Sequence, residues 1–198
     1  MKLTNYDFHL PERLIARFPE QNRDDSRLLV VDRQRNEFRA STFRELPQYF
    51  NEGDCLVLND TKVYPARLYA QSEKTGRKHQ FLLLSSLGHC VWKVIYNKTK
   101  KCSVGDQFRF QDDLTAELIE KFDGGVGQIL FNREVSYQEL HDIGNMALPP
   151  YILKLRDLVE EDKTRYQTVY SNEIGSIAAP TAGLHFTDDI LDRLKKKE

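Results

Sequence analysis

The sequence predicts an α/β domain that is interrupted by a small antiparallel β-barrel. Strand-like and helix-like segments alternate before Asp60, and six short strand-like runs then follow within about 70 residues. The proline-containing run ALPPYILK around Leu148 is a plausible return to the first domain, and helical patterns follow from Asp162. We therefore expect a discontinuous α/β domain at 1–63 and 148–198 and an inserted barrel at 64–147.

The opening α/β region contains two apolar runs on either side of a helical segment. The runs Leu28–Asp32 and Asp54–Asn59 are bounded by charged or turn residues, which predicts two buried strands. Phe43–Phe50 has apolar residues at helical spacing around Pro47, which predicts a short or broken helix.

Strands with turn signals between them dominate the next region. The clearest alternation lies in one strand, where one face carries Cys90, Trp92, Val94 and Tyr96 and the other carries Val91, Lys93 and Ile95. This is expected where the two faces of a strand meet different environments. Closure into a barrel would remove unpaired edges. The expected strands are Val63–Ala70, His79–Ser85, Cys90–Tyr96, Gln107–Phe110, Leu114–Lys121 and Gly127–Asn132.

A capped helix is expected at Ser136–Gly144. Ser136 is a good N-cap, Glu139 stands where a reciprocal partner would be, and Gly144 is expected as a left-handed stop. The two prolines of ALPPYILK that follow predict a rigid, extended connector.

Two more helices are expected towards the end of the sequence. In Asp162–Ser171, the residues Tyr166, Val169 and Tyr170 have helical spacing. Thr187 is a good N-cap for a last helix, which has acids in its first turn and lysines in its last.

Composition limits the class of protein. The 198 residues, 40% hydrophobic, can bury a core, and no apolar run approaches the roughly 20 residues of a membrane span. No signal-peptide pattern opens the chain, so we expect a cytoplasmic protein without membrane association. Cys55, Cys90 and Cys102 lack CxxC spacing, which predicts reduced packing residues. Phosphate-loop, GxGxxG, HExxH and GxSxG motifs are absent.

The charge is distributed unevenly. The net charge is −1, but the range Tyr64–Phe110 has nine basic and two acidic residues, a local net of +7 that leaves −8 for the rest. Clustered basic residues can replace the counterions of nucleic-acid phosphates, or can form a lysine-rich solvated surface. Both interpretations stay open.

Four motifs suggest chemistry, each beside a structural alternative. In NRDDSRLLVVDR, Arg23 and Arg27 are either part of a salt-bridged turn or an anion grip whose geometry the neighbouring carboxylates fix. In LNDTK, residues 59–62 form either a tight turn or a ligand-contacting strand end with Asp60 as a base or hydroxyl acceptor.

The other two motifs lie later in the chain. The tyrosines of RYQTVYS are either core residues or aromatic faces for a cation or a base. The loop AAPTAGLHFT has neither strand nor helix periodicity, and Gly183 permits close ligand approach. His185 is either a hydrogen-bonded structural residue or an acid and base near neutral pH.

Five ordered motifs, NRDDSRLLVVDR, GDCLVLNDTKVYPARL, LPPYI, DKTRYQTVYS and GSIAAPTAGLHFT, closely resemble those of the S-adenosylmethionine:tRNA ribosyltransferase-isomerase family. The resemblance runs through the whole chain. It implies transfer and isomerisation of the ribosyl group of S-adenosylmethionine onto 7-aminomethyl-7-deazaguanine in the tRNA anticodon. Adenine and methionine leave, and epoxyqueuosine remains. It also implies an α/β domain with an inserted barrel, S-adenosylmethionine as co-substrate, and no metal or prosthetic group.

The resemblance also implies roles for residues. Asp60 and His185 are the candidates for proton exchange. Tyr166, Tyr170 and Phe186 would line a cation-tolerant pocket, and Arg23 and Arg27 would hold a carboxylate or phosphate. The further candidates for substrate binding are Asn59, Thr61, Lys62, Arg67, Gln167, Pro180, Thr181 and Gly183, and those for tRNA contact on the barrel are Lys98, Lys100 and Lys101.

Two features depart from the family pattern. Gln80 stands where members of the family usually have an acidic residue before the LLL strand. Members of the family, which are monomers when intact, also continue well beyond the helix that is last in this sequence. The resemblance therefore implies an α/β domain that is incomplete at its C-terminal end, with exposed apolar edges on its sheet. We expect such a chain to be unstable, to associate through these edges or to be inactive. The alternatives are a fragment or decayed copy of the enzyme, a noncatalytic RNA-binding remnant, and a small-molecule binding module.

Overall fold

The computed structural model describes residues 2–111 and 113–197, which form two compact units. The first unit contains the described residues up to Asp54, Pro150–Asp157 and those from His185 onwards. The barrel unit contains Cys55–Pro149 and Leu158–Leu184. The domain boundaries expected at 63/64 and 147/148 stay a prediction. Within the described residues, no helix is both long and apolar enough to span a membrane.

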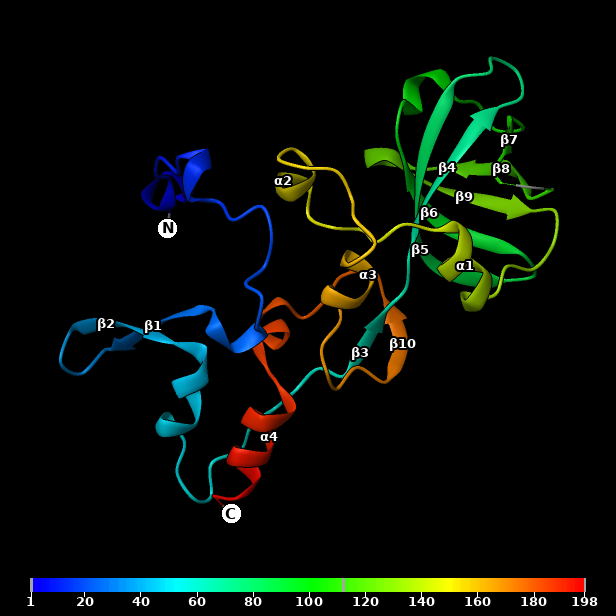
Figure 1. Ribbon diagram of the computed structural model, residues 1–198. Coiled ribbons are helices and arrows are strands. Elements are labelled where there is room, and N and C mark those ends of the chain that lie inside the picture. Colours follow the sequence, from blue (N-terminus) through cyan, green and yellow to red (C-terminus); the bar gives the residue numbers. More distant parts are fainter. Residues whose placement is uncertain (1, 112, 198) are drawn as a thin grey trace. The chain divides into compact units, whose positions relative to one another are not determined.

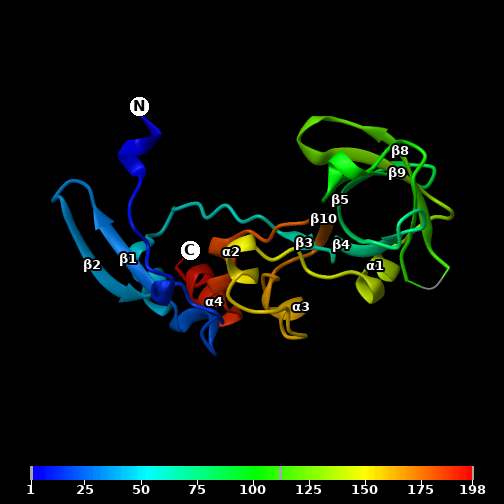
Figure 2. The same ribbon diagram turned by 90° about the horizontal axis from the view of Figure 1, so that it is seen from above.

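Six antiparallel strands close the barrel in the spatial order β4-β5-β6-β9-β8-β7 (Figures 1 and 2). Closure confirms the expectation of an inserted antiparallel barrel between α/β segments. The strands are β4 (Arg67–Ser72), β5 (Lys78–Gly88), β6 (Val91–Tyr96), β7 (Gln107–Arg109), β8 (Thr115–Lys121) and β9 (Val126–Phe131).

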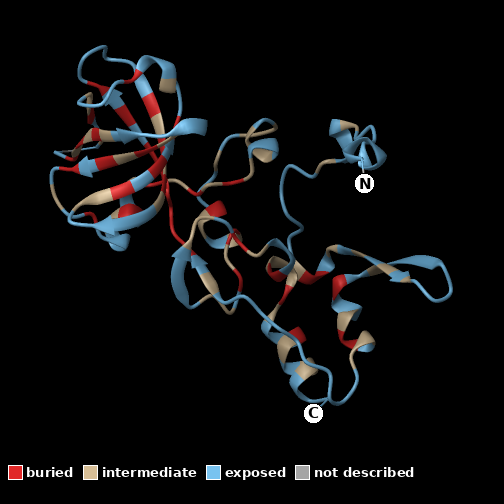
Figure 3. Cartoon of the chain, turned by 180° about the vertical axis from the view of Figure 1, so that it is seen from behind, coloured by how far each residue is buried: buried red, intermediate tan, exposed pale blue. Residues whose placement is uncertain are grey.

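The core of the barrel comes from alternate residues of its strands. Trp92, Val94 and Tyr96 of β6 are buried, which confirms the predicted face, and Figure 3 shows the same alternation along the other strands. Phe81 is 0% exposed and contacts Phe108 edge-on with ring centroids 5.0 Å apart. Strand closure thus places one row of side chains from each strand in a common interior.

The predicted strand Val63–Ala70 is wrong as a single element. It divides into β3 (Thr61–Val63), which pairs in parallel with β10 (Glu173–Ser176), and β4 of the barrel. Pro65 lies at the break and has no N–H for a ladder, while the Tyr64 N–H donates to the Ser176 carbonyl. One apolar run therefore serves two different sheets.

In the first unit, β1 (Arg27–Asp32) and β2 (Glu37–Thr42) form a two-stranded antiparallel ribbon. The predicted strand at 28–32 is confirmed, but its predicted burial is wrong. Leu29 and Val31 are 67% and 58% exposed, and Phe38, opposite Val31, is 76% exposed. Among the described residues no third strand pairs with this ribbon, so nothing covers this face.

The predicted strand Asp54–Asn59 is wrong. The segment has no ladder partner among the described residues, and Val57 is 87% exposed. An apolar extended run becomes a strand only where a neighbour accepts and donates its main-chain hydrogen bonds. Cys55 lies in this exposed segment and is not a packing residue, whereas Cys102 is buried.

The helix expected at Phe43–Phe50 is a 3-10 helix, η4 (Phe43–Tyr49), with Pro47 inside it. Against it packs α4 (Asp188–Lys195), whose Thr187 side chain caps the Ile190 N–H as predicted. The shorter 3-10 helices are η1 (Leu3–Tyr6), η2 (Glu12–Leu14), η3 (Arg23–Asp25), η5 (Thr99–Lys101), η6 (Asp123–Gly125) and η7 (Thr181–His185).

The helix after the barrel, α1 (Tyr137–Ile143), is capped by Ser136 as predicted, and its Glu139 forms an ion pair with Arg133 at 2.6 Å. The left-handed stop is wrong, because Gly144 has φ −90°. Glycine is required there for another reason: a Cβ atom would collide with the Pro65 carbonyl oxygen.

Of the two remaining helices, α2 was not predicted and α3 is shorter than predicted. Pro150 starts α2 (Pro150–Leu153), so only part of the proline connector is extended. The helix expected over Asp162–Ser171 is α3 (Asp162–Arg165), which ends at Tyr166. Tyr166, Val169 and Tyr170 therefore do not share a helix face.

Candidate functional site

The predicted site residues fall in both compact units. Arg23, Arg27, His185 and Phe186 belong to the first unit, and the others to the barrel unit. The loop AAPTAGLHFT is divided between the two, because the first unit resumes at His185. Each group is built separately from its own contacts.

In the first unit, the acidic pair of NRDDSR holds an arginine that the sequence reasoning missed. Asp24 and Asp25 lie in η3 directly before β1, and their carboxylates bind Arg44 of η4, with distances of 2.9 and 2.5 Å. The Arg44 hydrogen bond lowers the pKa of Asp24, against the effect of burial. The carboxylates thus hold η4 through Arg44.

His185 lies in an aromatic environment in the same unit. Its ring packs on Phe43, with centroids 5.3 Å apart, and Phe186 packs edge-on against the same ring at 5.0 Å. Burial lowers the pKa of His185, and a hydrogen bond from the imidazole to the Arg23 backbone opposes this. The fold thus joins the first and last predicted motifs, and it favours a neutral imidazole at pH 7.

In the barrel unit, main-chain hydrogen bonds join LNDTK to the segment after the tyrosines. The Asp60 carbonyl accepts from the N–H groups of Asn172 and Glu173 at 2.8 and 3.3 Å. The Asn59 side chain accepts from the Thr61 N–H at 3.0 Å, which is the local turn expected as one alternative. The Asp60 side chain is exposed at this turn.

Gln167 holds the start of the barrel connection. Its side-chain oxygen accepts from the Val63 N–H at 2.9 Å, and its amide donates to the Val63 carbonyl at 2.5 Å. Both ends of the amide are therefore engaged with one residue of β3. Gln167 is a positioning residue for the strand that carries Thr61 and Lys62.

The glycine of the AAPTAGLHFT loop lies against RYQTVYS. A Cβ atom on Gly183 would collide with the Tyr170 hydroxyl and lie 2.9 Å from Cγ2 of Thr168. Thr168, another residue that the sequence reasoning missed, is 4% exposed, and its hydroxyl has no hydrogen-bond partner among the described residues. Burial raises the pKa of Tyr170. Tyr166 is buried, Pro180 is half-buried, and Thr181 is exposed.

Arg67 is the most buried cation of the predicted set. It is 9% exposed, and its guanidinium donates to the Leu148 carbonyl at 3.4 Å. Its Nε is buried without a hydrogen-bond partner among the described residues. An unsatisfied buried donor costs free energy, so a ligand acceptor at this point would be stabilised.

The lysines predicted to contact tRNA lie on and beside η5. Lys98 has a left-handed backbone, and its ammonium donates to the Lys78 carbonyl at 2.7 Å. Lys121 donates to the carbonyls of Thr99 and Cys102, which fixes the loop to β8. Lys100 and Lys101 are exposed. Among the described residues, no group of three or more His, Cys, Asp or Glu side chains is arranged to hold a metal ion.

Comparison with known sequences gives a consistent result. The family model described as "Queuosine biosynthesis protein" matches residues 3–198. An S-adenosylmethionine:tRNA ribosyltransferase-isomerase from Staphylococcus saprophyticus is 45% identical over 98% of the chain, and one from Staphylococcus epidermidis is 45% identical over 100%. The chain spans 57% of the length of each of these relatives.

Comparison with solved structures also gives matches. One of them is the crystal structure of an S-adenosylmethionine tRNA ribosyltransferase from Thermotoga maritima, with 31% sequence identity and a TM-score of 0.36. The match covers 97% of this chain and 54% of that one.

Proposed function

Because the chain belongs to the queuosine biosynthesis protein family, we propose that it acts in S-adenosylmethionine:tRNA ribosyltransferase-isomerase chemistry. The reaction would transfer and isomerise the ribosyl group of S-adenosylmethionine onto 7-aminomethyl-7-deazaguanine in the tRNA anticodon, with release of adenine and methionine. The observation that carries the proposal is the 45% identity to relatives of that name over essentially the whole chain. A cytoplasmic location goes with such a substrate.

The first-unit residues would supply proton transfer and anion binding. The reaction needs a base for a ribose C5′ proton, which the sulfonium acidifies, and an acid near adenine. The lowered pKa of His185 supports a neutral imidazole that can accept a proton. Arg23, whose backbone receives the His185 hydrogen bond, and the exposed Arg27 would hold a carboxylate or phosphate.

The barrel-unit residues would bind the co-substrate. Tyr166 and Tyr170 would offer aromatic faces that attract a sulfonium, and Phe186 is the corresponding aromatic candidate within the first unit. Gly183 lets the loop pack directly on the Tyr170 hydroxyl, which supports a fixed position of this tyrosine beside the loop. Arg67 supports an anion contact through its unsatisfied Nε, and Asp60 is the second candidate for proton exchange.

The lysines Lys98, Lys100 and Lys101 would contact tRNA phosphates. The hydrogen bonds that fix their loop to β5 and β8 support a preorganised basic surface.

The exposed Leu29, Val31 and Phe38 support association of this chain through its β1–β2 ribbon. Sedimentation at rising protein concentration tests this association. The unchanged chain should associate, and Phe38→Asp should keep it monomeric.

Adenine release is the direct test of the reaction. The full chain is incubated with S-adenosylmethionine and tRNA that carries 7-aminomethyl-7-deazaguanine, and free adenine is quantified by chromatography. His185→Gln and Asp60→Asn should each lower the rate by about 100-fold or more if the residue exchanges a proton. His9→Gln, at an exposed residue outside the site, is the matched control.

A second candidate function is RNA binding without the reaction, which the basic loop of Lys98, Lys100 and Lys101 supports. A protein of this kind would bind tRNA without releasing adenine. Changing Lys98, Lys100 and Lys101 together to Glu should abolish tRNA binding in either case. Retention of S-adenosylmethionine binding with no tRNA binding in the unchanged chain would instead favour a small-molecule module.

A further inference from the structure

A cavity of about 470 Å³ opens in the barrel unit, between β3, α1 and α3. It lies at the junction of three segments that are far apart in the sequence. Its lining residues are Lys62, Val63, Pro65, Gln138, His141, Met146, Lys163, Thr164 and Gln167. None of these residues is acidic.

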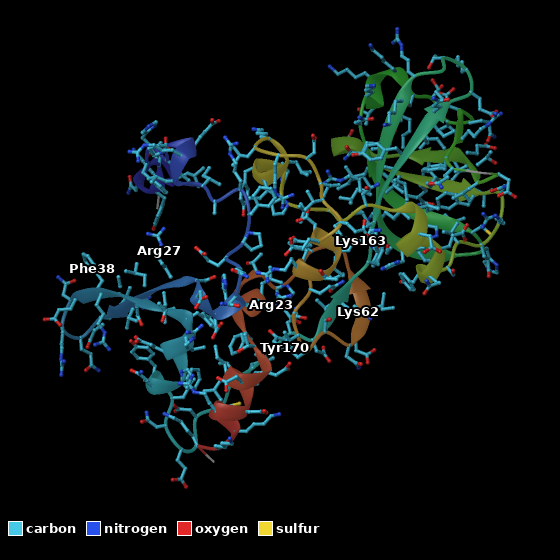
Figure 4. All side chains as sticks on the ribbon, in the orientation of Figure 1. Arg23, Arg27, Phe38, Lys62, Lys163 and Tyr170 are labelled. Carbon is cyan, nitrogen blue, oxygen red and sulfur yellow. The ribbon has the colours of Figure 1, made fainter. Side chains whose placement is uncertain are left out.

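The polar part of the lining is cationic. Lys62 comes from β3 and Lys163 from α3, and Figure 4 shows both side chains on these elements. Gln138 and His141 are three residues apart in α1, so they share one face of that helix. Two ammonium groups, an imidazole and an amide thus converge on one space from three elements.

The remaining wall combines the apolar residues Val63, Pro65 and Met146 with the polar residues Thr164 and Gln167. Val63 and Met146 are each 3% exposed, and Gln167 is held through both ends of its amide by Val63. Apolar walls reduce the solvent around an ion pair and so strengthen the attraction between its charges. An oxyanion bound here would meet the fixed amide of Gln167 on one side and the ammonium groups of Lys62 and Lys163 on the other.

The two ammonium groups are available to a ligand. Lys62 is exposed, and none of the ion pairs or hydrogen bonds among the described residues engages its ammonium group. Lys163 lies 3.0 Å from Glu160, whose side chain is 85% exposed. The Lys163 side chain is 30% exposed, but because its partner carboxylate lies in water the pair contributes little free energy, so an oxyanion can compete with Glu160.

We propose that this cavity is an oxyanion-binding site, with Lys62 and Lys163 as the two cations that hold the ligand. The same chemistry fits a phosphate of the tRNA backbone and the carboxylate of the methionine part of S-adenosylmethionine. The identification of these two sources rests on the proposed function, whereas the binding of an oxyanion in this cavity is independent of it.

The test starts with inorganic phosphate. The full chain, labelled with nitrogen-15, is titrated with phosphate while the amide resonances of Lys62, Val63 and Thr164 are followed. Saturable shifts are expected in the unchanged chain, and the double variant Lys62→Gln/Lys163→Gln should lose them. Lys154→Gln removes the same charge from an exposed residue of the first unit and should keep them. The absence of saturable shifts, or equal shifts in the double variant, overturns the proposal.

A variant with the opposite effect sharpens the test. Glu160→Gln removes the carboxylate that competes for Lys163, so phosphate should bind more tightly, by about twofold or more at low salt. Glu52→Gln changes the net charge equally at an exposed residue of the first unit and is the matched control. Equal affinities in the two variants would contradict a role for Lys163.

Two further titrations distinguish the sources. If the ligand is a tRNA phosphate, each single variant should weaken tRNA binding and lower the slope of log affinity against log salt by about 0.7–0.9. If it is the methionine carboxylate, affinity for S-adenosylmethionine should fall while the tRNA slope is unchanged. Phosphate binding without adenine release would leave the site intact and remove only the proposed reaction.

Discussion

The barrel and the β1–β2 ribbon are both built from apolar strands, yet they bury their side chains to very different extents. In the barrel, Phe81, Leu83 and Val94 are each 0% exposed. In the ribbon, Leu29 and Phe38 are 67% and 76% exposed. The difference is one of closure: barrel strands each have two neighbours and a shared interior, whereas ribbon strands have one neighbour each among the described residues.

The two regions therefore depend on different interactions. The stability of the barrel comes from removing apolar surface from water. The first unit is held more by polar contacts, such as the Arg44 bonds to Asp24 and Asp25, and by the small cluster of Phe43, Phe186 and Ile190. Four substitutions test this contrast.

The largest effect is expected from removing a barrel aromatic ring. Phe81→Ala should lower the free energy of unfolding of the barrel by about 3–5 kcal/mol, because it leaves a cavity among Tyr96, Phe108 and Phe110. The matched ribbon variant Phe38→Ala should change it by less than about 0.5 kcal/mol. Denaturant unfolding followed by Trp92 fluorescence measures both. Equal losses of unfolding free energy in Phe81→Ala and Phe38→Ala would contradict the difference between the barrel and the ribbon.

A smaller effect is expected where the barrel contacts its following helix. Gly144→Ala should lower the free energy of unfolding of the barrel unit by about 1–3 kcal/mol, since the backbone of Pro65 must move to admit a Cβ atom. Gly175→Ala in β10 meets nothing within 4 Å and is the control. Thermal unfolding by circular dichroism compares them, and a Gly144→Ala variant as stable as Gly175→Ala would contradict the close approach.

The pH dependence of the barrel should reflect a buried histidine. Burial lowers the pKa of His79 from its ordinary value of 6.5. The unfolded chain then binds a proton before the folded one, so stability is full above pH 6.5 and falls as the pH drops towards the folded pKa. Thermal unfolding between pH 8 and pH 5 should show this loss in the unchanged chain and less of it in His79→Phe. Identical profiles would exclude His79 as the cause.

The smallest effect is expected from the ion pair of the first unit. Asp24→Asn should lower the unfolding temperature at neutral pH and less so at high salt. The Arg44 hydrogen bond lowers the pKa of Asp24, so its stabilisation is present above the ordinary value of 3.8 and is lost as the pH falls through the folded pKa. Wild type and variant should therefore converge in acid. A difference that persists at pH 2 would indicate another cause.

Much of the barrel was predictable because its signals are local. The alternation of Trp92, Val94 and Tyr96 and the turn residues between strands depend only on neighbouring residues. The helix caps at Ser136 and Thr187 were predictable for the same reason, since each side chain bonds an N–H three residues away.

The errors concern contacts with distant residues. Asp54–Asn59 has the composition of a buried strand but no partner among the described residues, and Pro65 splits one apolar run between two sheets. A left-handed φ was predicted for Gly144, whereas the structure requires glycine there because a Cβ atom would collide with the Pro65 carbonyl oxygen. Arg44, Thr168 and Lys163 carried no local signal, because each gains its meaning from a side chain or a cavity far away in the sequence.

The sequence by itself determined the family, the closed barrel and the motifs, since these depend on residue order and local periodicity. Only the tertiary structure decided that Asp24 and Asp25 bind Arg44, that His185 bonds the Arg23 backbone, and that Lys62 and Lys163 share a cavity. The physical reason is distance along the chain: such contacts form only when folding brings together segments whose local patterns do not refer to one another.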